Sequence, residues 1–254
     1  MSMARRYPSS RHLKKAEQLK ISAAFPGRNS SNELANMKIV SVNCGLPREV
    51  VWQGMDVTTS IYKDPVSGRI PLRTLNLDGD RQSDLSVHGG KDKAVYCYPL
   101  EHYSYWKGKM PAVPFPLGAF GENFTTEGLV EQDVHIGDRF AIGSAEVVVT
   151  QPRMPCYKLG IRFQSNAMIK SFLDSRRSGF YVAVTREGDV GAGDEITKIS
   201  HASDLVSITD ILRLYIAKTF SEEDARLAQR AVAVDALPES WKEFFEDKLN
   251  RLSA

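Results

Sequence analysis

The sequence predicts a mainly β protein, with a closed or nearly closed β-barrel followed by a small bundle of three helices. Between residues 37 and 200, short β-branched runs alternate with turns rich in glycine, proline and aspartate, a pattern typical of small barrels. After His201 the apolar residues recur with a period near 3.6, which indicates amphipathic helices. A chain of 254 residues is expected to form one large domain, or one domain with an appendage.

The first part of the barrel is expected to contain strands at residues 38–43, 50–52 and 58–63. Residues 64–68 read Asp-Pro-Val-Ser-Gly, which is a strong turn signal. Because residues 70–77 return in β-like sequence after that turn, we expect a hairpin between 58–63 and 70–77.

The second part of the barrel continues with strands and two short helices. Gly143 and Ser144 separate two apolar segments and predict a tight hairpin. Helices are expected at residues 101–107 and 167–175. The strands expected here are 94–98, 139–142, 145–150, 180–185 and 195–199.

Three amphipathic helices are expected after residue 201. The first begins near Ser207, and the third begins at Pro238. The second begins with a capping box, in which Ser221 is the N-cap and Asp224 takes the place of the usual Glu or Gln at N3. Roughly 50 residues bury little surface alone, so the bundle should pack on the barrel or on a second chain, and its apolar faces are compatible with a homodimer.

The first 36 residues differ from the rest of the chain. They carry seven Lys and Arg but only two acidic residues, and they have no apolar core long enough for a secretory signal. Organelle transit peptides share this composition. An upstream start codon, a disordered tail and a short docked helix over 11–23 are the alternatives. We expect a poorly ordered extension at 1–36, a barrel domain at 37–200 and a helical domain at 201–254.

Bulk composition excludes several classes of protein. The net charge of +2 argues against a nucleic-acid binder. The three cysteines have neither CxxC spacing nor paired histidines, which argues against a structural zinc site and a disulfide scaffold. A reducing, cytoplasmic setting fits best. No run of about 18 apolar residues is present to cross a membrane.

The segment 151–159, Gln-Pro-Arg-Met-Pro-Cys-Tyr-Lys-Leu, is the most informative in the chain. Its two prolines predict a stiff turn at the end of a strand. A thiol at Cys156, near Arg153 and Lys158, should have its thiolate form stabilised and can act as a nucleophile, a redox group or a soft-metal ligand. A buried structural cysteine is the alternative, and it is the interpretation we favour for Cys44 and Cys97.

Three further segments carry polar residues in a fixed order. Residues 78–84 read Asp-Gly-Asp-Arg-Gln-Ser-Asp and lead into His-Gly-Gly-Lys at 88–91; residues 121–128 read Gly-Glu-Asn-Phe-Thr-Thr-Glu-Gly, and 136–138 read Ile-Gly-Asp. In this order, and ending in Pro-Arg-Met-Pro-Cys, they resemble the MOSC family, named for the C-terminal domain of molybdenum cofactor sulfurase. The resemblance runs from about Met37 to Ser200, and the helical tail is similar to that of YiiM-type members.

The resemblance implies a β-barrel that binds the molybdenum cofactor, with Cys156 as the molybdenum ligand. Molybdenum bound to molybdopterin is soft and takes a thiolate readily. Two glycines beside His88 allow close backbone approach and an anion-binding nest, although an ordinary loop is the alternative. Pyridoxal phosphate binding is also associated with the family as a whole. The expected cofactor-binding residues are Gly89, Gly90, Lys91, Asn123, Thr125, Arg153 and Lys158.

By the same resemblance, the protein reduces a small-molecule substrate, namely an N-hydroxylated compound such as hydroxylaminopurine. Glu122 or His88 would be the proton source, alongside Cys156 as the catalytic cysteine. Because no flavin, haem or iron–sulfur motif is visible, electrons would come from a partner redox protein.

Two other hypotheses remain open at the level of sequence. A sulfur or cofactor carrier would hold a persulfide on Cys156, and a shallow groove there would favour it, whereas a substrate-sized pocket would favour the enzyme. A nucleotide- or RNA-binding module would use the basic N-terminus, but that segment lacks the interleaved aromatic residues of a stacking platform.

Overall fold

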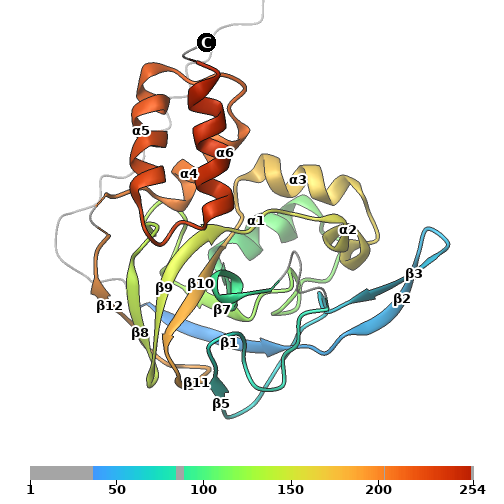
Figure 1. Cartoon of the computed structure of the whole chain (residues 1–254). Coiled ribbons are helices and arrows are strands. Elements are labelled where there is room, and N and C mark those ends of the chain that lie inside the picture. The colour runs from blue at the N-terminus through green and yellow to red at the C-terminus, as the bar shows by residue number, and fades with distance from the viewer. Residues whose placement is uncertain (1–36, 84–88, 203, 253–254) are drawn as a thin grey trace, which may run out of the picture. The chain divides into compact units, whose positions relative to one another are not determined.

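The computed structural model describes residues 37–83, 89–202 and 204–252, all of which lie in one compact unit. The predicted N-terminal extension and His88 lie outside the described residues. One large sheet dominates the fold, and three helices follow it at the C-terminal end (Figure 1). The predicted fold class, mainly β with a C-terminal helical bundle, is therefore confirmed.

The main sheet has eight strands in the order β12-β8-β9-β10-β6-β7-β1-β4. Neighbouring strands are antiparallel except β6 and β7, which are parallel and are connected through a helix. The strands of this sheet are β1 (Lys38–Cys44), β4 (Asp64–Pro65), β6 (Val95–Pro99), β7 (Phe124–Glu127), β8 (Arg139–Ile142), β9 (Ala145–Pro152), β10 (Phe180–Arg186) and β12 (Ile196–Ser200).

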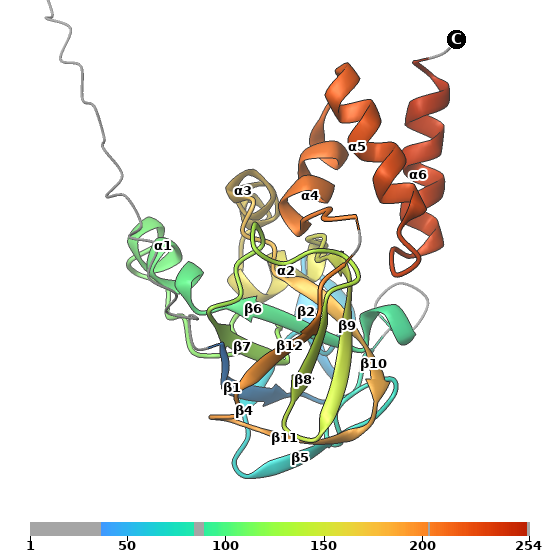
Figure 2. The ribbon, with the colours of Figure 1, turned by 90° about the vertical axis from the view of Figure 1, so that its left-hand side faces the viewer.

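The sheet bends but is not closed into a barrel, which corrects the predicted architecture. Over the described ranges, β1 meets the start of β12 only through an isolated bridge between Lys38 and Glu195. The turn Gly191–Asp194 occupies the place where a ladder would continue: the Ile39 amide donates to the Asp194 carbonyl, and the Gly193 amide donates to the Ile39 carbonyl. Strands β8, β9, β10 and β12 curve together in Figure 2.

The hairpin predicted between residues 58–63 and 70–77 is wrong. Instead, β2 (Arg48–Trp52) pairs with β3 (Met55–Thr59), and β5 (Arg69–Leu72) pairs with the distant strand β11 (Gly188–Gly191). The β2–β3 turn uses Gln53 and Gly54, both with positive φ, as tight two-residue hairpin turns require.

Besides β4 and the 3₁₀ helix at Lys91–Lys93, three elements are not predicted by the sequence patterns. Strand β7 lies inside the polar segment 121–128, which has the residue types of a turn. Strand β11 is only four residues long, and helix α2 (Tyr157–Phe163) begins directly after Cys156. All three are short, and short elements carry little periodicity of their own.

Helices α1 (Glu101–Lys109) and α3 (Ala167–Ser175) lie where helices are predicted. The C-terminal bundle contains α4 (Ile208–Ile216), α5 (Glu222–Ala233) and α6 (Glu239–Asn250). The capping box of Ser221 and Asp224 at the start of α5 is confirmed, and Ser207 forms a second capping box at the start of α4.

The bundle packs on the sheet. Buried residues of α4, α5 and α6 belong to the same hydrophobic cluster as those of β8 and β9, and Figures 1 and 2 both place the bundle over one end of β9. A buried hydrogen bond joins the two parts: the Trp241 Nε1–H donates to the Gln151 Oε1 at 2.9 Å.

A second hydrophobic cluster is rich in aromatic residues and surrounds β6 and α1. Trp106 is fully buried, its indole donates to the Tyr98 hydroxyl at 2.7 Å, and its ring stacks on Phe172. Each large apolar side chain buried in this way contributes roughly 1.5–3 kcal/mol relative to an exposed one. Three residues of this cluster, Ile61, Tyr96 and Phe120, also line the pocket described below.

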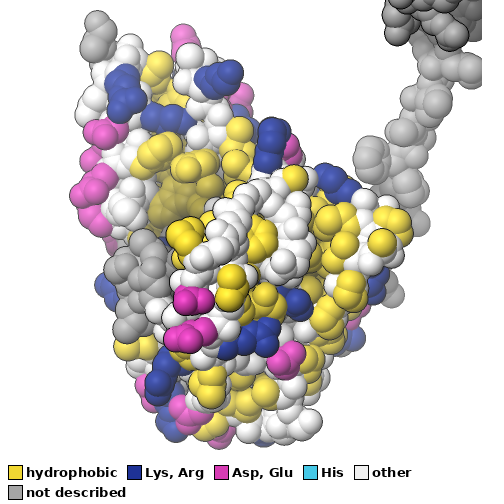
Figure 3. Space-filling view, turned by 90° about the vertical axis from the view of Figure 1, so that its right-hand side faces the viewer, with side chains coloured by type: hydrophobic (Ala, Val, Ile, Leu, Met, Phe, Trp, Pro, Cys, Tyr) yellow, Lys and Arg dark blue, Asp and Glu magenta, His cyan; other side chains and the backbone are white. Residues whose placement is uncertain are grey.

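The β2–β3 hairpin projects from the side of the molecule that Figure 3 looks onto. Val51 and Met55 are largely exposed there, and hydrophobic side chains are visible among basic and acidic ones on that face (Figure 3). None of the helices in the described ranges has the length and apolar character needed to span a membrane.

Candidate functional site

A pocket with about 630 Å³ of empty space, part of it open to solvent, lies beside Cys156. Segments far apart in the sequence form its walls, including those that follow β3 and β9. Its lining residues are Ser60, Ile61, Lys63, Asp80, Gln82, Ser83, Lys93, Tyr96, Phe120, Gly121, Asn123, Arg153, Met154, Cys156, Lys158 and Tyr181.

Cys156 is placed by the end of β9 and the start of α2. Strand β9 is fixed by pairing with β10 up to Pro152, and the extended segment 153–156 then leads to Cys156, which is the N-cap residue of α2. The Cys156 carbonyl accepts a hydrogen bond from the Leu159 amide at 2.9 Å. The side chain is partly exposed at the pocket.

The other two cysteines do not line this pocket. Cys97 is buried in the core cluster, and Cys44 is also buried. Burial raises the pKa of the Cys97 thiol well above its ordinary value, and burial with the nearby Asp80 charge raises the pKa of Cys44 to about 11. Neither thiol is a candidate nucleophile, as predicted, and none of the three cysteines, all of them described, forms a disulfide.

Arg153 forms a buried cationic wall of the pocket. Its side chain is only 5% exposed, and its guanidinium lies 5.5 Å from the centre of the Tyr96 ring and 4.9 Å from that of Phe172. The Nη1 atom is shielded from solvent and has no hydrogen-bond partner among the described residues. Because an unpaired buried donor is costly, this atom is suited to an anionic ligand in the pocket.

Three lysines add positive charge to the same walls. The Lys158 Nζ donates to the Ser83 hydroxyl at 3.0 Å. Burial lowers the pKa of Lys93, an effect opposed by the neighbouring Asp92. With Lys63 and Arg153, these groups give the pocket a cationic character that suits phosphate or other oxyanions.

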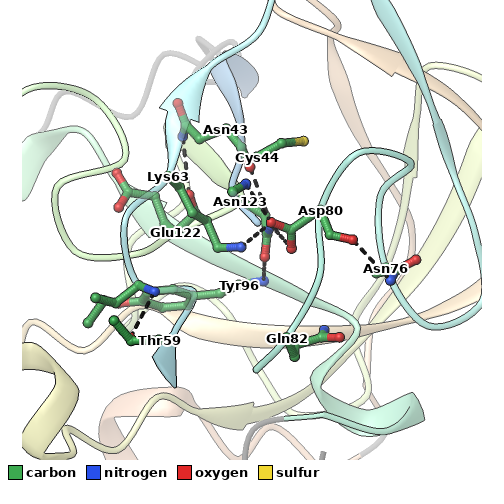
Figure 4. Close-up of polar contacts among 12 residues, drawn as sticks. Asn43, Cys44, Thr59, Lys63, Asn76, Asp80, Gln82, Tyr96, Glu122 and Asn123 are labelled. Atoms are coloured by element: carbon green, nitrogen blue, oxygen red, sulfur yellow. Dashed lines mark hydrogen bonds and ion pairs between the residues drawn. The ribbon is translucent and has the colours of Figure 1, made fainter. Parts of the chain in front are cut away.

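A buried polar network is centred on Asp80 (Figure 4), and three of its members, Asp80, Lys63 and Asn123, line the pocket. The Asp80 carboxylate forms an ion pair with Lys63 and accepts hydrogen bonds from the Gly45 amide at 2.8 Å and from the Asn123 Nδ2 at 2.9 Å. All four groups come from different segments of the chain. The network therefore fixes the relative positions of these segments, because removing any partner would leave a buried charge or dipole unsatisfied.

Of the three site residues predicted in the segment 121–128, one lines the pocket and two are buried outside its lining. Asn123 lines the pocket, with its Oδ1 accepting from the Tyr96 amide at 3.2 Å. Glu122 and Thr125 are fully buried and do not line it. Glu122 accepts hydrogen bonds from the Tyr103 hydroxyl, the Gly118 and Phe120 amides and the Thr125 hydroxyl.

Two opposing influences act on the pKa of the Glu122 carboxyl group. Burial raises the pKa of Glu122, and hydrogen bonds from Tyr103 and its other donors oppose that shift. Glu122 lies behind the pocket wall, and its hydrogen bonds with the Gly118 and Phe120 amides hold the surrounding loop in place.

The glycine-rich segment brings Lys93 to the pocket instead of Lys91. Gly90 has φ +94° and is the N-cap of the 3₁₀ helix η1 (Lys91–Lys93). Gly89, Gly90 and Lys91 do not line the pocket, whereas Lys93 at the other end of this turn does. Sequence reasoning missed Lys93, although its position two residues after the glycine-lysine pattern was the available signal.

Lys63, Asp80, Tyr96 and Tyr181 also line the pocket and are not among the predicted site residues. Asp80 belongs to the polar segment 78–84, whereas no local pattern marks Lys63, Tyr96 or Tyr181. Taken together, the pocket combines a thiol, four cationic side chains and aromatic walls. This donor set fits an anionic, planar ligand that carries a soft metal.

Comparison with known proteins places this fold among related chains. A family model for the MOSC domain matches residues 84–197. The uncharacterized protein YflK of Bacillus subtilis (strain 168) is 36% identical over 217 residues, covering 84% of this chain and 95% of the relative. The crystal structure of YiiM from Geobacillus stearothermophilus superposes with a TM-score of 0.70 at 34% identity, covering 84% of this chain and 99% of that one.

A more distant match is to a longer protein. A protein named reductase from Gibberella moniliformis (strain M3125 / FGSC 7600) is 30% identical over 171 residues, which is 66% of this chain but only 30% of that protein. The family model, the full-length relative and the YiiM fold agree with one another. The chain therefore belongs to the MOSC domain family, among its YiiM-like members.

Proposed function

We propose that the pocket beside Cys156 binds the molybdenum cofactor and that the protein is a reductase of N-hydroxylated compounds. The observation that carries this proposal is the meeting of the Cys156 thiol and the buried, unpaired Nη1 of Arg153 in one cationic pocket. Membership of the MOSC family and the relative named reductase support it.

Cys156 would supply the thiolate ligand to molybdenum, and Arg153, Lys158 and Lys93 would hold the anionic parts of the cofactor. When bound, the cofactor supplies two-electron redox chemistry. The protein's own contribution is to orient it, since the segment carrying Cys156 is fixed on one side by β9 and on the other by α2.

Reduction of an N–OH group to N–H releases water and takes up two electrons and two protons. Lys93 has a pKa lowered by burial and lines the pocket, so it is suited to deliver a proton there. Glu122 lies behind the wall and would act by holding the loop. The role predicted for His88 concerns a residue outside the described ranges. Electrons would come from a separate redox protein.

A carrier of sulfur or cofactor that uses Cys156 is the alternative, and it would use the same pocket residues. The test is molybdenum and pterin analysis of the protein purified from a molybdenum-replete host. Cys156→Ser is compared with Cys44→Ser, a buried cysteine outside the pocket.

We expect molybdenum in the wild type and in Cys44→Ser, and its loss in Cys156→Ser. Reduction of hydroxylaminopurine with a reduced electron donor should follow the same order. Equal molybdenum in all three proteins would overturn the role of Cys156. Absence of molybdenum together with a persulfide on Cys156 would replace the reductase with a sulfur carrier.

A further inference from the structure

Ser60, like Arg153, lines the pocket and carries a buried side-chain atom without a hydrogen-bond partner among the described residues. Among the described residues, five buried side-chain atoms have no hydrogen-bond partner: Ser60 Oγ, Thr126 Oγ1, His135 Nδ1, Arg153 Nη1 and Arg162 Nε. Of these five, only Ser60 and Arg153 belong to residues that line the pocket. Most buried polar groups in proteins are paired, so two unpaired donors around one pocket call for a ligand.

The position of Ser60 is fixed by its neighbours. Thr59 is fully buried, and its hydroxyl accepts a hydrogen bond from the Ile61 amide at 3.2 Å. On the other side, Gly121 approaches so closely that a Cβ placed on it would lie 2.9 Å from the Ile61 Cγ1. Ser60 is itself 9% exposed. These contacts hold the segment 59–61 in place where Ser60 lines the pocket, as expected of a preorganised site.

We propose that Ser60 is a ligand-binding residue whose hydroxyl, together with the Nη1 of Arg153, donates to an oxyanion of the bound ligand. Both groups are donors, and Lys93 and Lys158 on the same walls supply the positive charge that an oxyanion prefers. A serine hydroxyl turns about one bond, so it can reach an acceptor without backbone movement. The inference rests on the proposed function only in placing the ligand in this pocket.

This role makes opposite predictions for stability and for binding. In the empty protein the Ser60 hydroxyl is buried without a partner, which destabilises the fold. Ser60→Ala should therefore stabilise the empty protein while weakening the ligand complex. Thr126 provides the matched control, because its hydroxyl is equally unpaired but it lies outside the pocket. Thr126→Val removes that hydroxyl at nearly constant shape.

The experiment measures thermal unfolding and calorimetric binding of inorganic phosphate for the cofactor-free wild type, Ser60→Ala and Thr126→Val. We expect both variants to raise the unfolding midpoint without phosphate by about 2–4 °C. Ser60→Ala should weaken phosphate binding about tenfold, and Thr126→Val should leave it unchanged. Equal phosphate affinity in wild type and Ser60→Ala, or no phosphate binding by the wild type, would overturn the assignment.

Molybdenum and pterin content of the same proteins from a molybdenum-replete host identifies the source of the oxyanion. Loss of both from Ser60→Ala assigns the oxyanion to the cofactor. Retention of both, with a raised KM for a phosphorylated N-hydroxylated substrate, assigns it to the substrate. A wild type without molybdenum whose phosphate binding still depends on Ser60 would refute the proposed reductase and leave the Ser60 site standing.

Discussion

At the scale of single residues, the pocket is distinguished by how few of its polar groups are available to a ligand. The amide of Asn123 and the carboxylate of Asp80 are occupied within the protein. By contrast, Arg153 and Ser60 retain unpaired donors. Asn123 and Asp80 therefore hold the site together, whereas Arg153 and Ser60 have donors available to bind a ligand. Residue type alone does not separate these two roles, because the difference lies in the partners that the fold supplies.

Cys97 and Cys156 should respond differently to substitution. Cys97→Ser places a hydroxyl in a core position that is 3% exposed, and we expect a loss of about 1–3 kcal/mol in the free energy of unfolding. Cys156→Ser, at a partly exposed position, should change it by less than about 0.5 kcal/mol. Urea denaturation of both cofactor-free variants checks this. A larger loss in Cys156→Ser would give that thiol a structural role.

Glu122 should make stability depend on pH in a direction opposite to that of an ion-paired acid. Because the folded-state pKa of Glu122 is raised, the folded protein holds this proton more tightly than the unfolded chain does. The resulting stability is fully present below the ordinary Glu pKa of about 4.3 and is lost as pH rises through the raised value.

Glu122→Gln removes this titration while keeping an acceptor for most of the same donors. We expect the stability difference between wild type and Glu122→Gln to shift in favour of the variant as pH rises above about 4.3. Urea unfolding across a pH series measures the difference. A difference that stays constant with pH would mean that the folded state leaves the Glu122 pKa where the unfolded chain has it.

Only part of the pocket lining could be predicted from sequence, and the exceptions have a common cause. Cys156 and Arg153 belong to a contiguous motif, which marks both of them. Lys63 and Asp80 reach the pocket only because a buried ion pair joins segments that the sequence does not link. The Gly-Gly-Lys pattern contains Lys91, so Lys91 is predicted as the binding residue. The pattern indicates a turn, but it does not show which lysine near that turn lines the pocket, and this is Lys93.

At the scale of elements, the capping box, which depends on neighbouring residues, is predicted correctly from sequence, whereas the pairing of strands far apart in the chain is not. The capping box at Ser221 depends on residues three apart, and it forms as predicted. The hairpin at 58–77 failed because β5 finds its partner in β11, far along the chain. A turn signal shows that the chain reverses, but the strand that it then meets is decided by tertiary packing.

The loop before β7 depends on a glycine for a reason that the structure makes clear. Gly121 has φ +81°, and a Cβ there would meet Ile61 beside the pocket. We expect Gly121→Ala to destabilise the protein by about 2–4 kcal/mol, through backbone strain and the clash together, and to weaken phosphate binding by displacing Ser60.

Gly54→Ala is the matched control, since Gly54 has φ +79° but a Cβ placed there would meet nothing within 4 Å. It should cost about 1 kcal/mol from backbone strain alone and leave phosphate binding intact. Thermal unfolding and calorimetric titration compare the two variants. Equal losses of stability in the two variants would show that the clash with Ile61 does not contribute to the destabilisation by Gly121→Ala.

At the scale of the whole molecule, the C-terminal bundle is connected to the pocket through hydrogen bonds as well as packing. Trp241 of α6 donates to Gln151 at the end of β9. The Gln151 Nε2 in turn donates to the Asp92 carbonyl in η1 at 3.3 Å, where the Thr150 hydroxyl also donates at 2.7 Å. These hydrogen bonds connect the bundle to the turn that carries Lys93 and to the strand that leads to Cys156.

Trp241→Phe tests this connection, since it removes the indole donor and keeps an aromatic ring. The buried Gln151 oxygen would lose its partner, so we expect a loss of about 1–3 kcal/mol in the free energy of unfolding. Cofactor retention and phosphate affinity should also fall, because Gln151 is then able to turn away from Asp92. Phe244→Leu, in the same aromatic group of α6, is the control that perturbs packing without touching Gln151.

If the two variants lose similar stability and retain cofactor equally, the bundle serves only to cover the sheet. A fall in retention confined to Trp241→Phe would mean that α6 helps to hold the pocket in shape. Gln151→Glu separates the two links further, because a carboxylate still accepts from Trp241 but cannot donate to the Asp92 carbonyl. Weakened phosphate binding in Gln151→Glu would then place the coupling at the η1 turn, and unchanged binding would place it in β9.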